Sequence, residues 1–175
     1  SILLEPRKVF SDMRGALYTN VQIGDSTSYH DLSGGGETAN CYMVNAPGYY
    51  SLPLIYGNAR GEGDVDNESA YTSKAEYVGP LSEKFVLKKF VDHNDAAISG
   101  PDIPGILIGD AVLLWQDSPE LVRDVHLDAD RKKINFQIDK EAINQGNAII
   151  AVRANDSNKT ILWSWHIWVT HYDWN

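Results

Sequence analysis

Residues 160–170 read Thr160-Ile161-Leu162-Trp163-Ser164-Trp165-His166-Ile167-Trp168-Val169-Thr170 and hold three of the five tryptophans of the chain. Each aromatic ring carries a large apolar area, so such a segment is buried, forms a binding surface, or does both. Its β-branched and aromatic residues predict a strand. Successive side chains of a strand point to opposite faces, so the two faces can be read separately.

The two faces of this strand differ in polarity. One is wholly apolar and is expected in the core: Ile161, Trp163, Trp165, Ile167 and Val169. The other is mixed: Leu162, Ser164, His166, Trp168 and Thr170. We therefore expect Trp163 and Trp165 to be core residues. Trp168 is expected beside His166, on a face that is partly open to water or covered by a loop.

The C-terminal half contains further strand patterns that pair with one another. Residues 121–127 and 133–138 flank a turn sequence, and residues 148–153 and 160–170 flank another. Residues 111–115 add a short apolar run. Two successive hairpins in an all-strand context predict an all-β fold, an antiparallel immunoglobulin-like β-sandwich.

The N-terminal half adds three expected strands, at 15–23, 39–45 and 49–56. Residues 59–80 are rich in Gly, Asp, Glu and Ser and predict a long surface loop. Residues 81–91 fit either a helix face or a strand, and both alternatives stay open. No linker divides the chain, so we expect a single domain over residues 1–175 with an N-terminal extension.

Composition restricts the class of partner. The chain has 175 residues, with 15 basic and 24 acidic residues and a formal net charge of -9. This balance disfavours nucleic acid and an anionic membrane surface, because both attract basic patches. No apolar run approaches the length of a membrane span, so membrane insertion is not expected. Because the chain begins at Ser1 without a signal segment, we expect a mature protein or a part of a larger one.

The single cysteine, Cys41, raises the question of thiol chemistry together with His166. A nucleophilic cysteine needs a base within hydrogen-bond reach and a third group that orients the base. Cys41 alternates with Ala39 and Met43, and this predicts a small buried side chain on an apolar strand face. No phosphate-binding loop, dinucleotide fingerprint or hydrolase motif is present. We therefore expect no enzyme activity.

Two weaker patterns are candidate binding sites. Asp64, Asp66 and Glu68 form a dense group of oxygens that is a candidate calcium site, although it lacks the glycine and the distant glutamate of an EF-hand. Exposed aromatic rings beside polar groups are typical of sugar-binding sandwiches. The candidate ligand-binding residues are Trp168, His166, Tyr172 and Trp174.

Several strings in fixed order resemble modules of secreted and surface proteins of gut Bacteroidetes, which often occur in fimbrillin-like proteins. The resemblance covers about residues 39–172 and rests mainly on three strings: Asn40-Cys41-Tyr42, Leu114-Trp115-Gln116-Asp117 and Trp163-Ser164-Trp165-His166-Ile167-Trp168. It implies a β-sandwich, an extracellular or cell-surface location, and a role in surface assembly or adhesion. It implies no catalytic residues.

These observations predict a non-enzymatic structural or adhesive module whose partners are protein subunits of a surface assembly or host and microbial glycans. The alternatives are a carbohydrate-binding module of a glycan-degrading system and a phage structural protein that carries the same module. No cofactor is expected beyond calcium at the acidic group.

Overall fold

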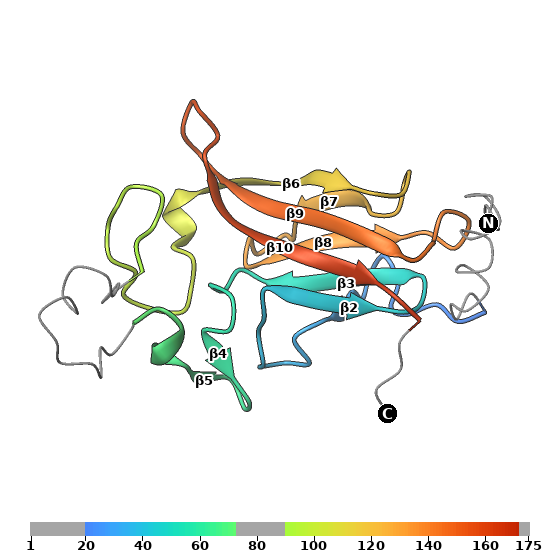
Figure 1. The fold of residues 1–175 in the computed structure, drawn as a ribbon, viewed down its shortest axis with the longest axis horizontal. Helices are drawn as coiled ribbons and strands as arrows, with labels where there is room; N and C mark the ends of the chain where they lie inside the picture. The colour runs from blue at the N-terminus through green and yellow to red at the C-terminus, as the bar shows by residue number, and fades with distance from the viewer. Residues whose placement is uncertain (1–19, 73–89, 172–175) are drawn as a thin grey trace, which may run out of the picture.

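The computed structural model describes residues 20–72 and 90–171, which are built from short and medium strands (Figure 1). The elements are, in chain order, β1 (His30–Asp31), β2 (Cys41–Val44), β3 (Gly48–Pro53), β4 (Arg60–Gly61), β5 (Val65–Asp66), the 3-10 turns η1 (Glu68–Ala70) and η2 (Gly105–Leu107), β6 (Ile108–Gln116), β7 (Arg123–Leu127), β8 (Lys133–Ile138), β9 (Gly146–Ala154) and β10 (Ile161–Val169).

The strands form two four-stranded sheets and one small sheet. The first sheet has the order β1-β3-β8-β7, the second has the order β2-β10-β9-β6, and β4 pairs with β5. The two large sheets lie as separate layers in Figure 1. No α-helix occurs in the described part of the chain, so the all-β prediction is confirmed.

The predicted hairpins are present, but the sheets are not purely antiparallel. β7 pairs with β8 and β9 pairs with β10 in antiparallel fashion, as predicted. By contrast, β1 runs parallel to β3 and β2 runs parallel to β10, so the prediction of an antiparallel fold is wrong for these pairs. Parallel neighbours need a long connection, and more than 100 residues separate β2 from β10. Local turn patterns carry no information about such a pair.

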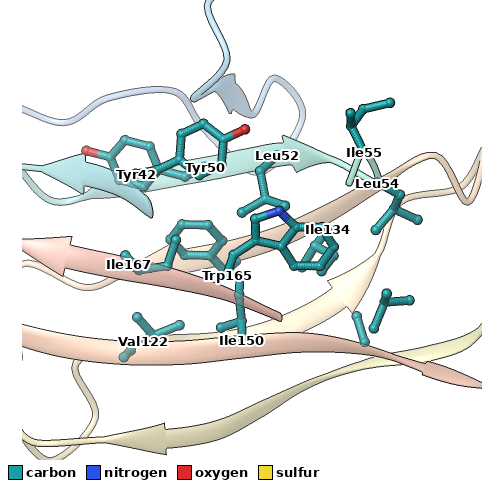
Figure 2. Packing of buried hydrophobic residues seen from close by; sticks show 14 of the residues in the cluster. Tyr42, Tyr50, Leu52, Leu54, Ile55, Val122, Ile134, Ile150, Trp165 and Ile167 are labelled. Atoms are coloured by element: carbon teal, nitrogen blue, oxygen red, sulfur yellow. The ribbon is translucent and has the colours of Figure 1, made fainter. Parts of the chain in front are cut away.

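The inner faces of the two sheets share one hydrophobic core (Figure 2). Trp165 is the largest side chain in it and is almost fully buried. Tyr50 of β3 stacks on Phe136, its partner in β8, with ring centroids 5.7 Å apart. The other fully buried members come from both sheets and include Leu52, Ile134, Ile138, Ile150, Val152, Ile167 and Val169.

The face assignment of β10 is confirmed at its C-terminal end and wrong at its start. Trp165, Ile167 and Val169 are buried as predicted, whereas Ile161 is 45% exposed and Leu162 is buried. The pairing of β9 with β10 has an irregularity between Ile161 and Trp163. An irregularity of this kind interrupts the period-two alternation, so the first residues reverse their faces.

Trp163 is partly buried and packs at the margin of the core. Its ring meets Tyr56 edge-on, with centroids 5.3 Å apart. Its Nε1 donates to Oδ1 of Asn40 at 3.0 Å. The prediction that Trp163 is a core residue therefore holds only for part of its ring.

The prediction that Cys41 is buried is wrong. In β2 the buried side chains are Tyr42 and Val44, and Cys41 is exposed on the opposite face. The apolar series Ala39, Cys41, Met43 suggested the wrong face because Tyr42 is as suitable for the core as the smaller residues.

The segment at 59–80 is more structured than a surface loop over the residues that are described, 59–72. It contains β4, β5 and η1, and its ends carry the buried side chains Ala59 and Tyr71. Of the expected strand at 15–23, the described part contributes one parallel bridge between Ile23 and Gly48. A Cβ at Gly48 would lie 2.2 Å from the carbonyl oxygen of Ile23, so this bridge requires glycine.

Within residues 20–72 and 90–171, no helix is long and apolar enough to cross a membrane.

Candidate functional site

The candidate site lies on the outer face of the second sheet, defined as the side chains of β2, β10, β9 and β6 that point away from the core. The strand registers place these side chains in two rows that cross the sheet. The first row is Cys41, His166, Ile149 and Trp115. The second row is Met43, Trp168, Asn147 and Asp117. Asp117 joins this row because its backbone N–H donates to the carbonyl oxygen of Asn147.

A chain of four hydrogen-bonded side chains runs across this face. Sγ of Cys41 lies 3.4 Å from Nδ1 of His166, and Nε2 of His166 lies 2.8 Å from Oδ1 of Asn147. Nδ2 of Asn147 donates to Oδ2 of Asp117 at 2.8 Å. The backbone N–H of Asn147 donates to Oδ1 of the same carboxylate at 2.7 Å.

These contacts assign the tautomer of the neutral imidazole. The Asp117 carboxylate only accepts hydrogen bonds, so the amide nitrogen of Asn147 faces it and the amide oxygen faces His166. The imidazole Nε2 must then carry the proton, which leaves Nδ1 as an acceptor for the Cys41 thiol. Cys41 is exposed to solvent on one side only, and partial desolvation raises the pKa of its thiol above its usual value. The thiol is therefore protonated at neutral pH and donates to His166.

Two exposed tryptophans flank this polar chain. Trp168 is 40% exposed and Trp115 is 53% exposed. Strand spacing and rise put their Cα atoms about 12 Å apart, with two strand intervals between them. His166 is half-buried on the same face, so the structure places the predicted pair Trp168 and His166 together.

A bulge in β6 brings Trp115 to this surface. The pairing of β6 with β9 shifts between Leu113 and Trp115, so Leu114 and Trp115 together oppose Ile149. Both side chains are exposed. Two residues opposite one is the geometry of a β-bulge, a feature that re-aims side chains near binding sites.

A shallow hollow of about 510 Å³ lies along β10 on the same side of the sheet. Its lining includes Asn40, Trp163, Ser164 and His166. The hydrogen bond from Trp163 to Asn40 holds the side-chain oxygen of Asn40 in place at the rim. His166 therefore belongs both to the hollow and to the polar chain.

An ion-paired cluster lies at the end of the outer face where β6 begins and β9 ends. Arg153 makes two hydrogen bonds to Asp110, from Nε at 2.8 Å and from Nη2 at 2.5 Å. Lys159 lies 3.5 Å from the same carboxylate. The hydrogen bond from Arg153 lowers the pKa of Asp110 below its usual value. This cluster occupies one end of the outer face, and the exposed tryptophans lie at the other end.

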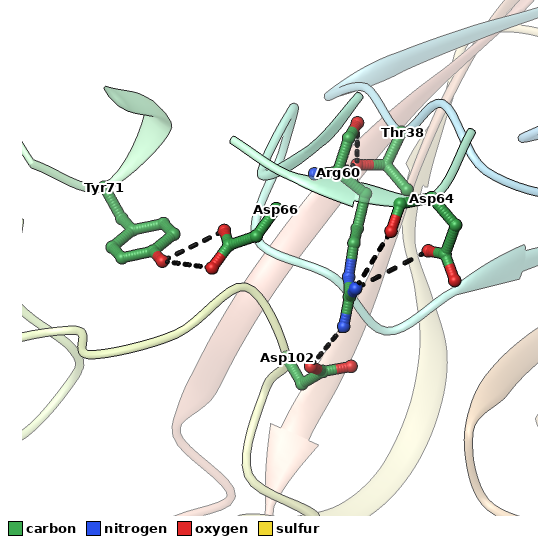
Figure 3. Close-up of polar contacts among 6 residues, drawn as sticks. All are labelled: Thr38, Arg60, Asp64, Asp66, Tyr71 and Asp102. Atoms are coloured by element: carbon green, nitrogen blue, oxygen red, sulfur yellow. Dashed lines mark hydrogen bonds and ion pairs between the residues drawn. The ribbon is translucent and has the colours of Figure 1, made fainter. Parts of the chain in front are cut away.

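The acidic group proposed as a calcium site does not assemble into one (Figure 3). Asp64 forms an ion pair with Arg60, and Nη1 of Arg60 lies 3.7 Å from the Asp64 carboxylate. The Asp66 carboxylate accepts from the hydroxyl of Tyr71 at 2.9 Å. Within the described ranges, no group of three or more Asp, Glu, His or Cys side chains is arranged to hold a metal ion. The calcium hypothesis for Asp64, Asp66 and Glu68 therefore has no support in the structure.

Arg60 is the partner of one of these carboxylates, Asp64. Its guanidinium also donates to Asp102 at 3.0 Å, and its backbone N–H donates to Oγ1 of Thr38 at 3.1 Å (Figure 3). The acidic side chains thus neutralise an arginine that joins the β4–β5 hairpin to its neighbours.

The remaining predicted ligand residues, Tyr172 and Trp174, lie outside the described residues. Sequence reasoning missed Trp115, Asn147 and Asp117 as members of the site. The adjacent apolar pair Leu114-Trp115 breaks strand alternation and was the available signal for a bulge. Asn147 is the second residue of β9, next to the buried Ala148, and had no signal beyond its position on the alternate face.

Comparison of the chain with protein-family models, with curated proteins and with solved structures finds no match.

Proposed function

We propose that the chain is an adhesive binding module of a secreted or cell-surface protein, with an immunoglobulin-like β-sandwich as its scaffold and a neutral glycan as its ligand. Two four-stranded sheets around one core support the sandwich. The observation that carries the binding function is the exposure of Trp168 and Trp115 on one sheet face, on either side of a hydrogen-bonded Asn147 and Asp117.

The chemistry of this face suits a sugar. A sugar ring presents C–H groups on its faces and hydroxyls around its edge, so aromatic platforms and amide or carboxylate groups complement it. Two platforms about 12 Å apart suit an oligosaccharide of several rings better than one monosaccharide. The net charge of -9 and the carboxylate of Asp117 favour neutral glycans over sulfated or sialylated ones.

The test is a glycan array followed by titration calorimetry with the strongest neutral glycan. We expect Trp168→Ala and Trp115→Ala each to weaken binding at least tenfold, which corresponds to about 1.4 kcal/mol. Ile106→Ala is a matched control because Ile106 is 84% exposed and lies in η2, outside this face. Absence of glycan binding, or equal affinity of the tryptophan variants and the control, would overturn the proposal.

A second candidate function is assembly with other subunits, as in a fimbrillin-like protein. The supporting observation is that β2 is an edge strand of the second sheet and contains only four residues, Cys41–Val44. An edge strand offers unpaired backbone groups to a strand from a partner. This function predicts concentration-dependent self-association in sedimentation experiments, and a monomer at high concentration contradicts it.

A further inference from the structure

The polar chain on the outer face has the arrangement that a nucleophilic thiol requires. Cys41 is exposed, and its sulfur lies 3.4 Å from the unprotonated nitrogen of His166. Asn147 accepts from the other imidazole nitrogen at 2.8 Å and is itself held by Asp117. A nucleophile next to a base, with the base oriented by a third group, is the diagnostic geometry of nucleophilic catalysis. Cys–His–Asn is one of its recurring forms.

We propose that Cys41 and His166 are catalytic residues that hydrolyse small esters on the outer face, next to the hollow that His166 lines, and that Asn147 and Asp117 position His166. This goes beyond the binding function, does not rest on it, and departs from the expectation of a non-enzymatic module.

The reaction balances with water as the second substrate. Nδ1 of His166 takes the thiol proton while Sγ of Cys41 attacks the ester carbonyl carbon and forms a C–S bond. The C–O bond to the alcohol then breaks, and His166 returns the proton to the departing alkoxide, which leaves an acyl group on Cys41. His166 next takes a proton from water, the hydroxide oxygen attacks the acyl carbon, the C–S bond breaks, and the sulfur recovers its proton. The products are a carboxylic acid and an alcohol.

Two side chains that carry hydrogen-bond donors line the hollow, Asn40 and Ser164. Asn40 directly precedes Cys41, and its side-chain oxygen accepts from Nε1 of Trp163. Ser164 lies two residues before His166 on the same strand, with an exposed side chain. A donor that faces the developing charge stabilises the oxyanion of the tetrahedral intermediate, and we assign this role to Ser164.

Esters are a better substrate class than amides for this site. An alkoxide leaves more readily than an amine anion and demands less stabilisation. The thiol is protonated at rest because partial desolvation raises the pKa of Cys41. Attack therefore depends on proton removal by His166 during the reaction.

The test uses the full chain, in which every thiol signal reports Cys41 because the chain has one cysteine. Hydrolysis of p-nitrophenyl acetate and alkylation by iodoacetamide are measured between pH 5 and pH 9. We expect many turnovers per chain, loss of turnover in Cys41→Ser, and a fall of at least 100-fold in His166→Ala. His166→Gln is the second variant if His166→Ala does not fold, as judged by circular dichroism.

Three further variants separate catalysis from a structural role. Asn147→Ala is expected to shift the pH profile of both reactions, because the imidazole loses the acceptor that orients it. Ser164→Ala is expected to lower ester turnover and leave alkylation unchanged, since alkylation builds no oxyanion. His126→Ala is the matched control, because His126 lies in β7 of the other sheet and should change neither rate.

Release of only one equivalent of p-nitrophenol, or equal rates in the wild type and His166→Ala, would overturn the proposal. Cys41→Ser is expected to retain glycan affinity, so failure of the esterase and failure of the binding function give different results.

Discussion

Two buried tyrosines should govern the alkaline unfolding of this protein. Tyr42 and Tyr50 both belong to the core (Figure 2) and are 6% and 3% exposed. The hydroxyl of Tyr50 donates to the carbonyl oxygen of Ala46 at 2.6 Å, and that of Tyr42 accepts from the N–H of Ala39 at 3.1 Å. Burial raises the pKa of Tyr42 to about 12 and also raises the pKa of Tyr50.

The sign of the effect follows from these directions. A phenol whose pKa is higher in the folded state holds its proton more tightly there than in the unfolded chain, where its pKa is about 10. Its contribution to stability is complete below pH 10 and is lost as the pH rises through the folded value. For Tyr42 the two-unit difference amounts to about 3 kcal/mol, most of it lost between pH 10 and pH 12. Tyr50 adds a loss of the same sign.

The assay is urea denaturation followed by circular dichroism at pH 8, 10, 11 and 12. Tyr42→Phe should lower the free energy of unfolding at pH 8 by about 1 kcal/mol, because the N–H of Ala39 loses its acceptor. It should also make the decline above pH 10 shallower than in the wild type, and Tyr50→Phe should do the same. Val152→Ala is the control, since it creates a cavity without removing a titrating group. If the tyrosine variants and the control decline with the same slope, the reasoning is refuted.

Three other predictions concern the core, the ion-paired cluster and metal binding. Trp165→Ala should lower the free energy of unfolding by about 3–5 kcal/mol in urea titrations, because Trp165 is buried. Trp168→Ala should change it by less than about 1 kcal/mol, because Trp168 is exposed. Equal losses in the two variants would contradict the face assignment. Asp110→Asn should cost at most about 1 kcal/mol at low salt and less at high salt, since the pair with Arg153 is partly exposed. The lowered pKa of Asp110 means that this contribution is present at neutral pH and disappears as the pH falls below about 4; a salt-independent loss would argue against an ionic origin. Calcium or chelator should leave Tm unchanged, and a rise in Tm with calcium would indicate a site outside the described groups.

The strands of the C-terminal half could be predicted because their signals are local. Alternation in 133–138 and in the second half of 160–170 follows the two-residue period of a strand, and turn sequences join the members of each hairpin. The predictions failed where the period is interrupted. The irregularity after Ile161 reverses the faces of the first residues of β10, and the bulge at Leu114 exposes two consecutive side chains of β6. Neither feature follows from composition.

The candidate site was only partly predictable. Trp168 and His166 lie on one strand, so their shared face could be derived from the sequence. The other members come from distant segments: Cys41 is 125 residues from His166, and Asp117 is 30 residues from Asn147. Only the order of the strands in the sheet brings these side chains together.

The amino-acid order alone determines that this chain is built from strands and that Trp165 belongs to its core, because alternation and apolar area act over neighbouring residues. The tertiary structure decides that Cys41 faces outward, that β2 lies parallel to β10, and that Trp115 joins Trp168 on an open face. These features depend on which remote strands pair with one another. The backbone hydrogen bonds of a sheet do not depend on the identity of the side chains, so they do not select the partner of a strand. The packing of the whole core selects it.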